Sequence, residues 1–181
     1  MKFLITVLKI IALIIAGSFI AGLYGILHDQ ITFTIAPEYF TKFKFIQFRH
    51  MIFLHCSDRF NVSVIGFLAT YWVGTFVASL LGLVNLIIGA EELFAKTLKA
   101  FLIVLLVTAC FWAAGYAAGR IITANCSTEQ ILGWGIYFPR GIKDVKGFMT
   151  VGFIHNFSYL GGFAGMIAGN IWLVRNRKKQ K

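Results

Sequence analysis

Four long apolar runs dominate this sequence of 181 residues and limit the folds that are open to it. A transmembrane helix needs about 20 consecutive, mostly apolar residues. Runs of this kind cover residues 10–27, 64–88, 100–118 and 149–174. Hydrophobic residues make up 59% of the chain and charged residues 13%, so a water-soluble fold of this size would lack the polar surface to cover its apolar side chains. The sequence therefore predicts an all-α fold, a four-helix transmembrane bundle that forms a single integral membrane domain over residues 1–181.

The start of the chain also has features of a signal peptide, because Met1 and Lys2 precede an apolar run. Lys9 interrupts this pattern, and a long apolar stretch without a clear polar cleavage region follows it. We therefore expect the first helix to be retained.

Two of the three connections between the runs are long. Residues 28–63 and residues 119–148 are rich in aromatic and basic side chains, whereas residues 89–99 form a short loop. Basic residues are enriched on the cytoplasmic side of membrane proteins. The two sides carry nearly equal numbers of them, but a dense cluster ends the chain at Arg175, Arg177, Lys178, Lys179 and Lys181. We therefore expect both termini in the cytoplasm and both long loops, in ordered form, on the outer face.

The net charge of +10 would suggest a nucleic-acid partner if the protein were soluble. Here the basic residues flank the apolar runs, as membrane topology requires. We therefore expect the lipid bilayer to be the partner of this chain, and no nucleic acid.

The first long loop contains two patterns of secondary structure. Residues 31–35 alternate apolar and polar side chains, which predicts a short strand or an extended segment. Pro37 and Glu38 are typical of a first helical turn, and Glu38 lies four residues before Lys42. The stretch 39–54 interleaves aromatic and basic residues, so we expect either a helix lying in the membrane interface or a lid over the bundle.

Small residues at four-residue spacing predict where the helices touch. Lipid is as apolar as leucine, so helices in a membrane associate through close packing of small side chains. The fourth run carries Gly161, Gly165 and Gly169, and the third carries Gly115 and Gly119. We expect these glycines to face other helices of the bundle; the same pattern would also serve a homo-oligomer or a membrane protein partner.

The four histidines are candidate metal ligands because all of them fall on the outer half of the predicted topology. His28 is followed by Asp29, His50 and His55 precede the second run, and His155 lies on the glycine-rich face of the fourth run. Imidazole and carboxylate ligands suit zinc, copper and iron, so these five residues form a candidate transition-metal site. No HExxH or CxxC spacing accompanies them. The alternative is that the first three histidines bond to water, headgroups or backbone, and that His155 bonds to a neighbouring helix.

Two cysteines fall in the long loops. Cys56 belongs to the first loop and Cys126 to the second, and an outer location exposes both to an oxidising compartment. The sequence thus allows either a Cys56–Cys126 disulfide or two unrelated thiols. Cys110 lies within the third run and is expected to be a small core or lipid-facing residue.

One segment of the first loop resembles a known group of proteins. It consists of His28-Asp29-Gln30-Ile31-Thr32 followed by Pro37-Glu38-Tyr39-Phe40-Thr41-Lys42-Phe43-Lys44-Phe45. This segment is similar to one in a family of uncharacterised bacterial multi-pass inner-membrane proteins. The resemblance implies a location in the bacterial inner membrane, and it implies no activity, cofactor or catalytic residue.

Motifs of common enzyme classes are missing from the sequence, which has no GxSxG, no P-loop, no GxGxxG and no pair of acidic residues within a run. We therefore lean against an enzyme and expect a structural or accessory membrane protein with an outer cap. Two alternatives stay open. One is a membrane-embedded metal or redox site near the outer face, and the other is a pore or carrier for small solutes.

Overall fold

The computed structural model describes residues 1–88 and 92–176 of the chain. Over these residues the protein is all-α, and its long helices are α1 (Lys2–Ile35), α4 (Asp58–Ile87), α5 (Leu93–Ala124) and α7 (Val145–Arg175). The short elements are α2 (Pro37–Tyr39), the π-helix η1 (Phe40–Lys44), α3 (Phe45–Gln47), the 3-10 helix η2 (Arg49–Met51) and α6 (Thr128–Leu132). All four long helices are long and apolar enough to cross a membrane. The predicted bundle of four apolar helices is therefore confirmed.

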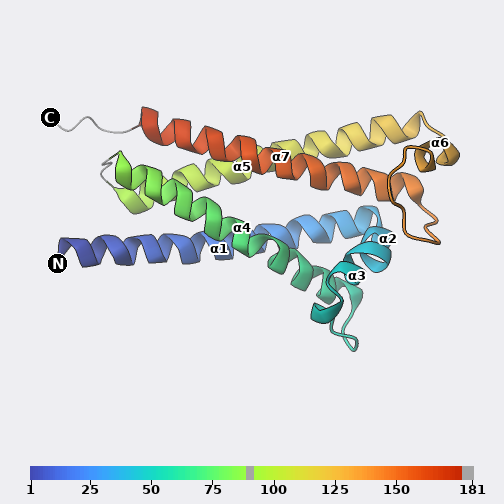
Figure 1. Cartoon of the computed structure of the whole chain (residues 1–181), viewed down its shortest axis with the longest axis horizontal. Coiled ribbons are helices and arrows are strands. Elements are labelled where there is room, and N and C mark those ends of the chain that lie inside the picture. Colours follow the sequence, from blue (N-terminus) through green and yellow to red (C-terminus); the bar gives the residue numbers. More distant parts are fainter. Residues whose placement is uncertain (89–91, 177–181) are drawn as a thin grey trace.

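The long helices form two antiparallel pairs. α1 packs mainly on α4, and α5 packs mainly on α7. Figure 1 shows the start of α1 and the end of α7 at one end of the bundle, which we call the terminal end, and the short elements at the other, which we call the cap end. The helices have 30 to 34 residues, or about 45–51 Å at 1.5 Å per residue. They therefore reach beyond the hydrocarbon core of a bilayer, which is roughly 30 Å thick.

The helices differ from the predicted spans chiefly in length. They extend beyond those spans at both ends, except that α4 ends at Ile87, just before the predicted limit of 88. Hydropathy detects the part of a helix that is apolar throughout, whereas the hydrogen-bonded backbone continues into more polar sequence. The connections between the helices are correspondingly shorter than expected.

Residues 31–35 are helical, so the predicted strand is wrong. α1 continues through this segment and ends just before Pro37, whose ring disfavours a helical residue in front of it. The Thr32 and Thr34 hydroxyls each donate to the carbonyl four residues earlier, both at 3.0 Å. Arg59 of α4 also donates to Thr34 Oγ1 at 3.2 Å. Contacts within α1 and with α4 thus override the local alternation of side chains.

The aromatic and basic stretch forms a lid over the cap end. α2, η1 and α3 make one helical segment over 37–47 that contains a π turn. The predicted helix over 39–54 does not continue beyond it, because the chain turns at Phe48 (φ −104°, ψ 24°) toward the start of α4. Phe40 is fully buried and Tyr39 is nearly so, against the aromatic core of the cap. Of the two arrangements expected for this stretch, the lid is the one observed.

Glu38 and Lys42 join the lid to the second loop. Glu38 Oε1 pairs with Lys42 Nζ at 2.8 Å, and Glu38 Oε2 accepts hydrogen bonds from the backbone N–H groups of Lys143 (2.8 Å) and Asp144 (2.9 Å). Lys42 Nζ also donates to the carbonyl of Gly141, which takes a positive φ of 74° that glycine adopts without strain. These bonds hold the two loops together as one cap.

All five glycines that the sequence predicts to face other helices lie in the contact between α5 and α7. A Cβ built at Gly115, Gly119, Gly161 or Gly165 would lie less than 3.0 Å from the partner helix, so something would have to shift. A Cβ built at Gly169 would lie 3.0 Å from the Ala100 carbonyl oxygen, which is a tight contact. At Gly165, for example, it would lie 2.8 Å from the carbonyl oxygen of Val104. The two backbones approach closely at these positions, which is how helix pairs gain packing energy in lipid.

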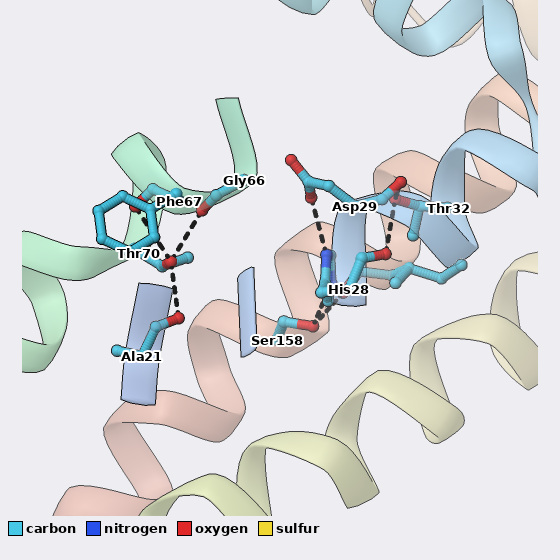
Figure 2. Close-up of polar contacts among 9 residues, drawn as sticks. Ala21, His28, Asp29, Thr32, Gly66, Phe67, Thr70 and Ser158 are labelled. Carbon is cyan, nitrogen blue, oxygen red and sulfur yellow. Dashed lines mark hydrogen bonds and ion pairs between the residues drawn. The ribbon is translucent and has the colours of Figure 1, made fainter. Parts of the chain in front are cut away.

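Small residues and one threonine join α1 to α4. A Cβ built on Gly17 would lie 3.1 Å from the carbonyl oxygen of Gly74. Thr70 Oγ1 lies 2.8 Å from the Ala21 carbonyl oxygen of α1 and 2.8 Å from the Gly66 carbonyl oxygen of its own helix (Figure 2). The hydroxyl thus bridges the two helices inside the bundle.

Two groups of residues named by the sequence analysis stay unsettled. Cys56 and Cys126 carry free thiols, and Figure 1 draws the segment before α4 and α6 on opposite sides of the cap end. The Cys56–Cys126 disulfide stays a prediction. Cys110 is exposed on the outside of α5, where it would face lipid.

Of the terminal basic cluster, Arg175 ends α7. The other four residues lie outside the described residues: Arg177, Lys178, Lys179 and Lys181.

Candidate functional site

The polar centre of the bundle begins with His28 and Asp29, near the cap end of α1. His28 Nδ1 lies 2.9 Å from Asp29 Oδ1, and His28 Nε2 lies 3.2 Å from the Ser158 hydroxyl of α7 (Figure 2). All three side chains are buried. A carboxylate oxygen accepts hydrogen bonds, so in the tautomer that satisfies this contact the His28 Nδ1–H points to Asp29 and Nε2 carries the lone pair. Asp29 thereby orients the His28 ring with Nε2 toward α7. To bind an ion together with His28, the Asp29 carboxylate would turn away from Nδ1.

His155 of α7 completes this polar centre. Its ring centroid lies 4.7 Å from that of His28, and the Tyr39 ring of the lid stacks on it at 5.1 Å. The side chain is 6% exposed, and its Nε2 has no hydrogen-bond partner among the described residues. An unpaired buried polar atom costs about 1–3 kcal/mol. A ligand bound at this nitrogen would remove that cost.

Three of the five predicted metal ligands converge, and two do not. One donor atom each from His28, Asp29 and His155 lies within 4.8 Å of the other two. His50 and His55 are exposed in the segment before α4, where His50 Nε2 accepts a hydrogen bond from the neighbouring arginine at 3.2 Å. The bundle brings α1 and α7 together at the cap end, whereas His50 and His55 lie in the connection between the lid and α4.

The converging donors are chemically suited to a first-row transition metal. Two imidazole nitrogens and a carboxylate oxygen are common ligands of zinc and iron. Ligands held about 2.1 Å from a tetrahedral ion lie about 3.4 Å apart. Since the three donors span up to 4.8 Å, binding an ion requires small rotations of these side chains. Ser158 lies beside His28 and adds a hydroxyl to the same surface.

A cavity of about 330 Å³ extends from this centre into the middle of the bundle. Its polar end is formed by the residues just described, and the rest of its wall is mostly apolar and comes from all four long helices, as with Ala21, Val77, Val104 and Met166. Cavities of about 300–1,000 Å³ with a few convergent polar groups are typical of small-molecule sites. The cavity therefore has the size and the polarity gradient of a site for an amphipathic ligand.

Lys44 of the lid lines the polar end of this cavity. The residue is 7% exposed, and its ammonium makes no hydrogen bond or ion pair with the part of the chain that the structure describes. Burial lowers the pKa of Lys44, and the negative charge of Asp29 acts in the opposite direction. One cation, one carboxylate and two imidazoles thus meet at one end of an apolar cavity.

The lid covers the polar centre on the cap side. Tyr39 and Phe40 both contact the His155 ring, with centroids 5.1 and 6.5 Å away. The hydrogen bond from Lys42, followed by those from backbone N–H groups of the second loop, lowers the pKa of Glu38 to about 2. The carboxylate that fastens the lid is therefore ionised at physiological pH.

Sequence analysis did not assign Lys44, Ser158 or Tyr39 to the site. Ser158 follows His155 by three residues on a helix, so helical periodicity places the two on one face, but it does not show that Ser158 meets His28 of α1. Lys44 and Tyr39 gave no such signal. Their burial depends on the lid folding back over the bundle, which no local pattern specifies.

Comparison with known proteins yields no match, whether to protein-family models, to curated proteins or to solved structures. The four long apolar helices define the class of this protein: it is a multi-pass membrane protein with four candidate spans, and its lateral surface contacts lipid.

Proposed function

We propose that this protein binds one transition-metal ion at His28, Asp29 and His155, inside the membrane domain and beneath its cap. The observation that carries the proposal is the convergence of the three buried donors within 4.8 Å. The Nε2 of His155, which lacks a partner among the described residues, adds a free donor to this set.

The chemistry of the surroundings supports an ion at this position. Polar and ionisable groups inside a membrane domain are costly and are retained mainly for function. The Asp29 carboxylate offsets part of the charge of a divalent ion, while the imidazoles bind as neutral ligands. Three protein ligands would leave one tetrahedral position free for a further ligand, and all three residues line the cavity.

We also propose a location and an orientation. The resemblance of residues 28–45 to bacterial inner-membrane proteins supports the inner membrane, and the basic C-terminus supports cytoplasmic termini. The cap would then lie on the outer face, between the metal site and the exterior.

Metal retention by the purified protein tests the proposal. Wild-type protein in detergent, loaded with Zn²⁺ or Co²⁺ and then dialysed, should retain about one ion per chain in elemental analysis, and the Co²⁺ form should show the visible absorption of a four-coordinate site. His155→Ala and Asp29→Asn should each weaken binding roughly tenfold or more.

Two exposed histidines of the connection before α4 provide matched controls. His50→Ala and His55→Ala remove imidazoles that are exposed and lie apart from the converging donors, so both variants should retain the ion. Ser158→Ala perturbs the same neighbourhood without removing a proposed ligand and reports general damage to the site. Wild-type protein that retains no ion, or controls that lose it as readily as His155→Ala, would refute the proposal.

The ordered cap supports a second candidate, an accessory role in which the outer surface docks another membrane protein. The supporting observation is that Glu38 fastens the lid to the second loop through hydrogen bonds from the Lys143 and Asp144 backbone N–H groups. Glu38→Gln should then weaken partner binding in a cross-linking assay and leave metal retention unchanged. Equal cross-linking of wild type and variant would count against this role.

A further inference from the structure

We infer that the central cavity binds a lipid with an anionic headgroup, which enters from the bilayer between α4 and α7 and places its charge beside Lys44. This inference concerns a ligand different from the metal ion, and it holds with or without that ion. It rests on the opening of the cavity, on its buried cation and on its apolar wall.

The cavity reaches the lipid-facing surface between α4 and α7. Phe76 of α4 is 58% exposed, and Tyr159 and Phe163 of α7 are 66% and 63% exposed, yet all three also line the cavity. Figure 1 shows α4 and α7 diverging from the terminal end toward the cap end. In a membrane this surface faces acyl chains, so a lipid chain has a lateral route into the bundle.

A counter-charge within hydrogen-bonding distance would stabilise the ammonium of Lys44. Removing a cation from water is costly unless an anion or several hydrogen bonds compensate for it. Asp29 attracts Lys44 but is already hydrogen-bonded to His28 at 2.9 Å, and Lys44 has no ion pair of its own within the described chain. An anionic headgroup at the polar end of the cavity would supply this charge at hydrogen-bonding distance.

The rest of the cavity suits the chain of the same lipid. Its wall beyond the polar end is mostly apolar, so an acyl chain there would be buried at no polar cost. A Cβ built on Gly162, which lines the cavity, would meet no atom within 4 Å. A neutral lipid would leave Lys44 unpaired, and a zwitterionic headgroup would bring a second cation beside it. Both are therefore weaker candidates than an anionic lipid.

Two lysolipids that differ only in the headgroup test this inference. The protein is reconstituted in phosphatidylcholine vesicles with EDTA, and lysophosphatidic acid and lysophosphatidylcholine carrying the same spin-labelled chain are compared by electron paramagnetic resonance. Wild-type protein should bind the anionic probe roughly tenfold more tightly. Lys44→Gln should bring its affinity down to that of the zwitterionic probe.

Each variant has a matched control. Lys96→Gln removes a cation that is 8% exposed but lies on α5 at the terminal end, where it donates to the Asn176 carbonyl at 3.1 Å; it should keep the preference. Gly162→Leu fills the cavity and should weaken the binding of both probes. Gly152→Leu adds the same side chain on the same helix, at a position also free of neighbours within 4 Å and outside the cavity wall, and should bind both probes as wild type does.

Three results would overturn the inference. Wild-type protein without preference for the anionic probe removes the role of the cation. An equal loss in Lys44→Gln and Lys96→Gln assigns the preference to overall charge instead of the cavity. Binding of the anionic probe that appears only after Zn²⁺ is added places the headgroup on the metal and not on Lys44. Because EDTA is present in the main experiment, a protein that retains no metal can still bind the lipid, and the two proposals fail separately.

Discussion

Replacing Gly165 by alanine should destabilise the bundle, because α7 and α5 have no room for a Cβ at this position. A Cβ on Gly165 would lie 2.8 Å from the Val104 carbonyl oxygen and 2.9 Å from the Val104 Cα, whereas ordinary contact begins at 3.4 Å. Both neighbours are backbone atoms, so relief requires the helices to separate by about 0.6 Å, the difference between 3.4 and 2.8 Å. A gap of this size forfeits roughly a quarter to a half of the attraction between facing atoms. We expect a loss of about 1–3 kcal/mol, as for other overpacked sites.

Gly162→Ala is the matched control for this change. It makes the same substitution on the same helix, but its Cβ would meet no atom within 4 Å. Alanine is a better helix former than glycine by about 0.8–1 kcal/mol in water, and comparing the two variants cancels this contribution. The free energy of unfolding is measured for each protein by reversible denaturation with sodium dodecyl sulfate in mixed micelles, followed by circular dichroism. Stabilities of Gly165→Ala and Gly162→Ala that agree within about 0.5 kcal/mol would refute the close approach of the two helices.

Three further predictions concern the cap, the contact between α1 and α4, and the orientation. The pKa of Glu38 is lowered from 4.5 to about 2, so its contacts stabilise the cap above pH 4.5 and are lost as the pH falls toward 2. An NMR titration of the Lys143 and Asp144 amides should therefore have its midpoint near pH 2. A midpoint near pH 4.5 would contradict this prediction. Thr70→Val should destabilise the bundle by about 0.6 kcal/mol, because it removes the hydrogen bond to the Ala21 carbonyl of α1. Thr150→Val is the control and should cost less, because the Thr150 hydroxyl bonds within its own helix at 2.8 Å. In a Cys110→Ser, Cys126→Ser background, a membrane-impermeant maleimide added to intact cells should label the exposed Cys56, and labelling only after lysis would reverse the proposed orientation.

The candidate site could be predicted in part. The types and the predicted side of the histidines were enough to nominate His28, Asp29 and His155, because ionisable groups stand out against apolar helices. The same reasoning nominated His50 and His55, which are exposed in the connection before α4. Sequence position shows on which side of the membrane a residue is expected, but it does not show which residues on that side meet.

The sequence alone determined the number of long helices and the fold class. Both depend on hydropathy and length, which are local properties, and on the need of each backbone polar group in lipid for a partner within its own helix. Local patterns failed at residues 31–35, where alternation suits a strand, but hydroxyl bonds along α1 and the contact from Arg59 of α4 favour the helix.

The tertiary structure decided which polar groups share the centre of the bundle. His28 and His155 meet because α1 and α7 converge at the cap end, and Lys44 joins them because the lid folds back over that end. These contacts join residues far apart in the chain, and they follow from how closely glycine-lined helices can approach and where the lid is fastened. No property of a single segment contains that information, since the position of each segment is set by the shapes of the others.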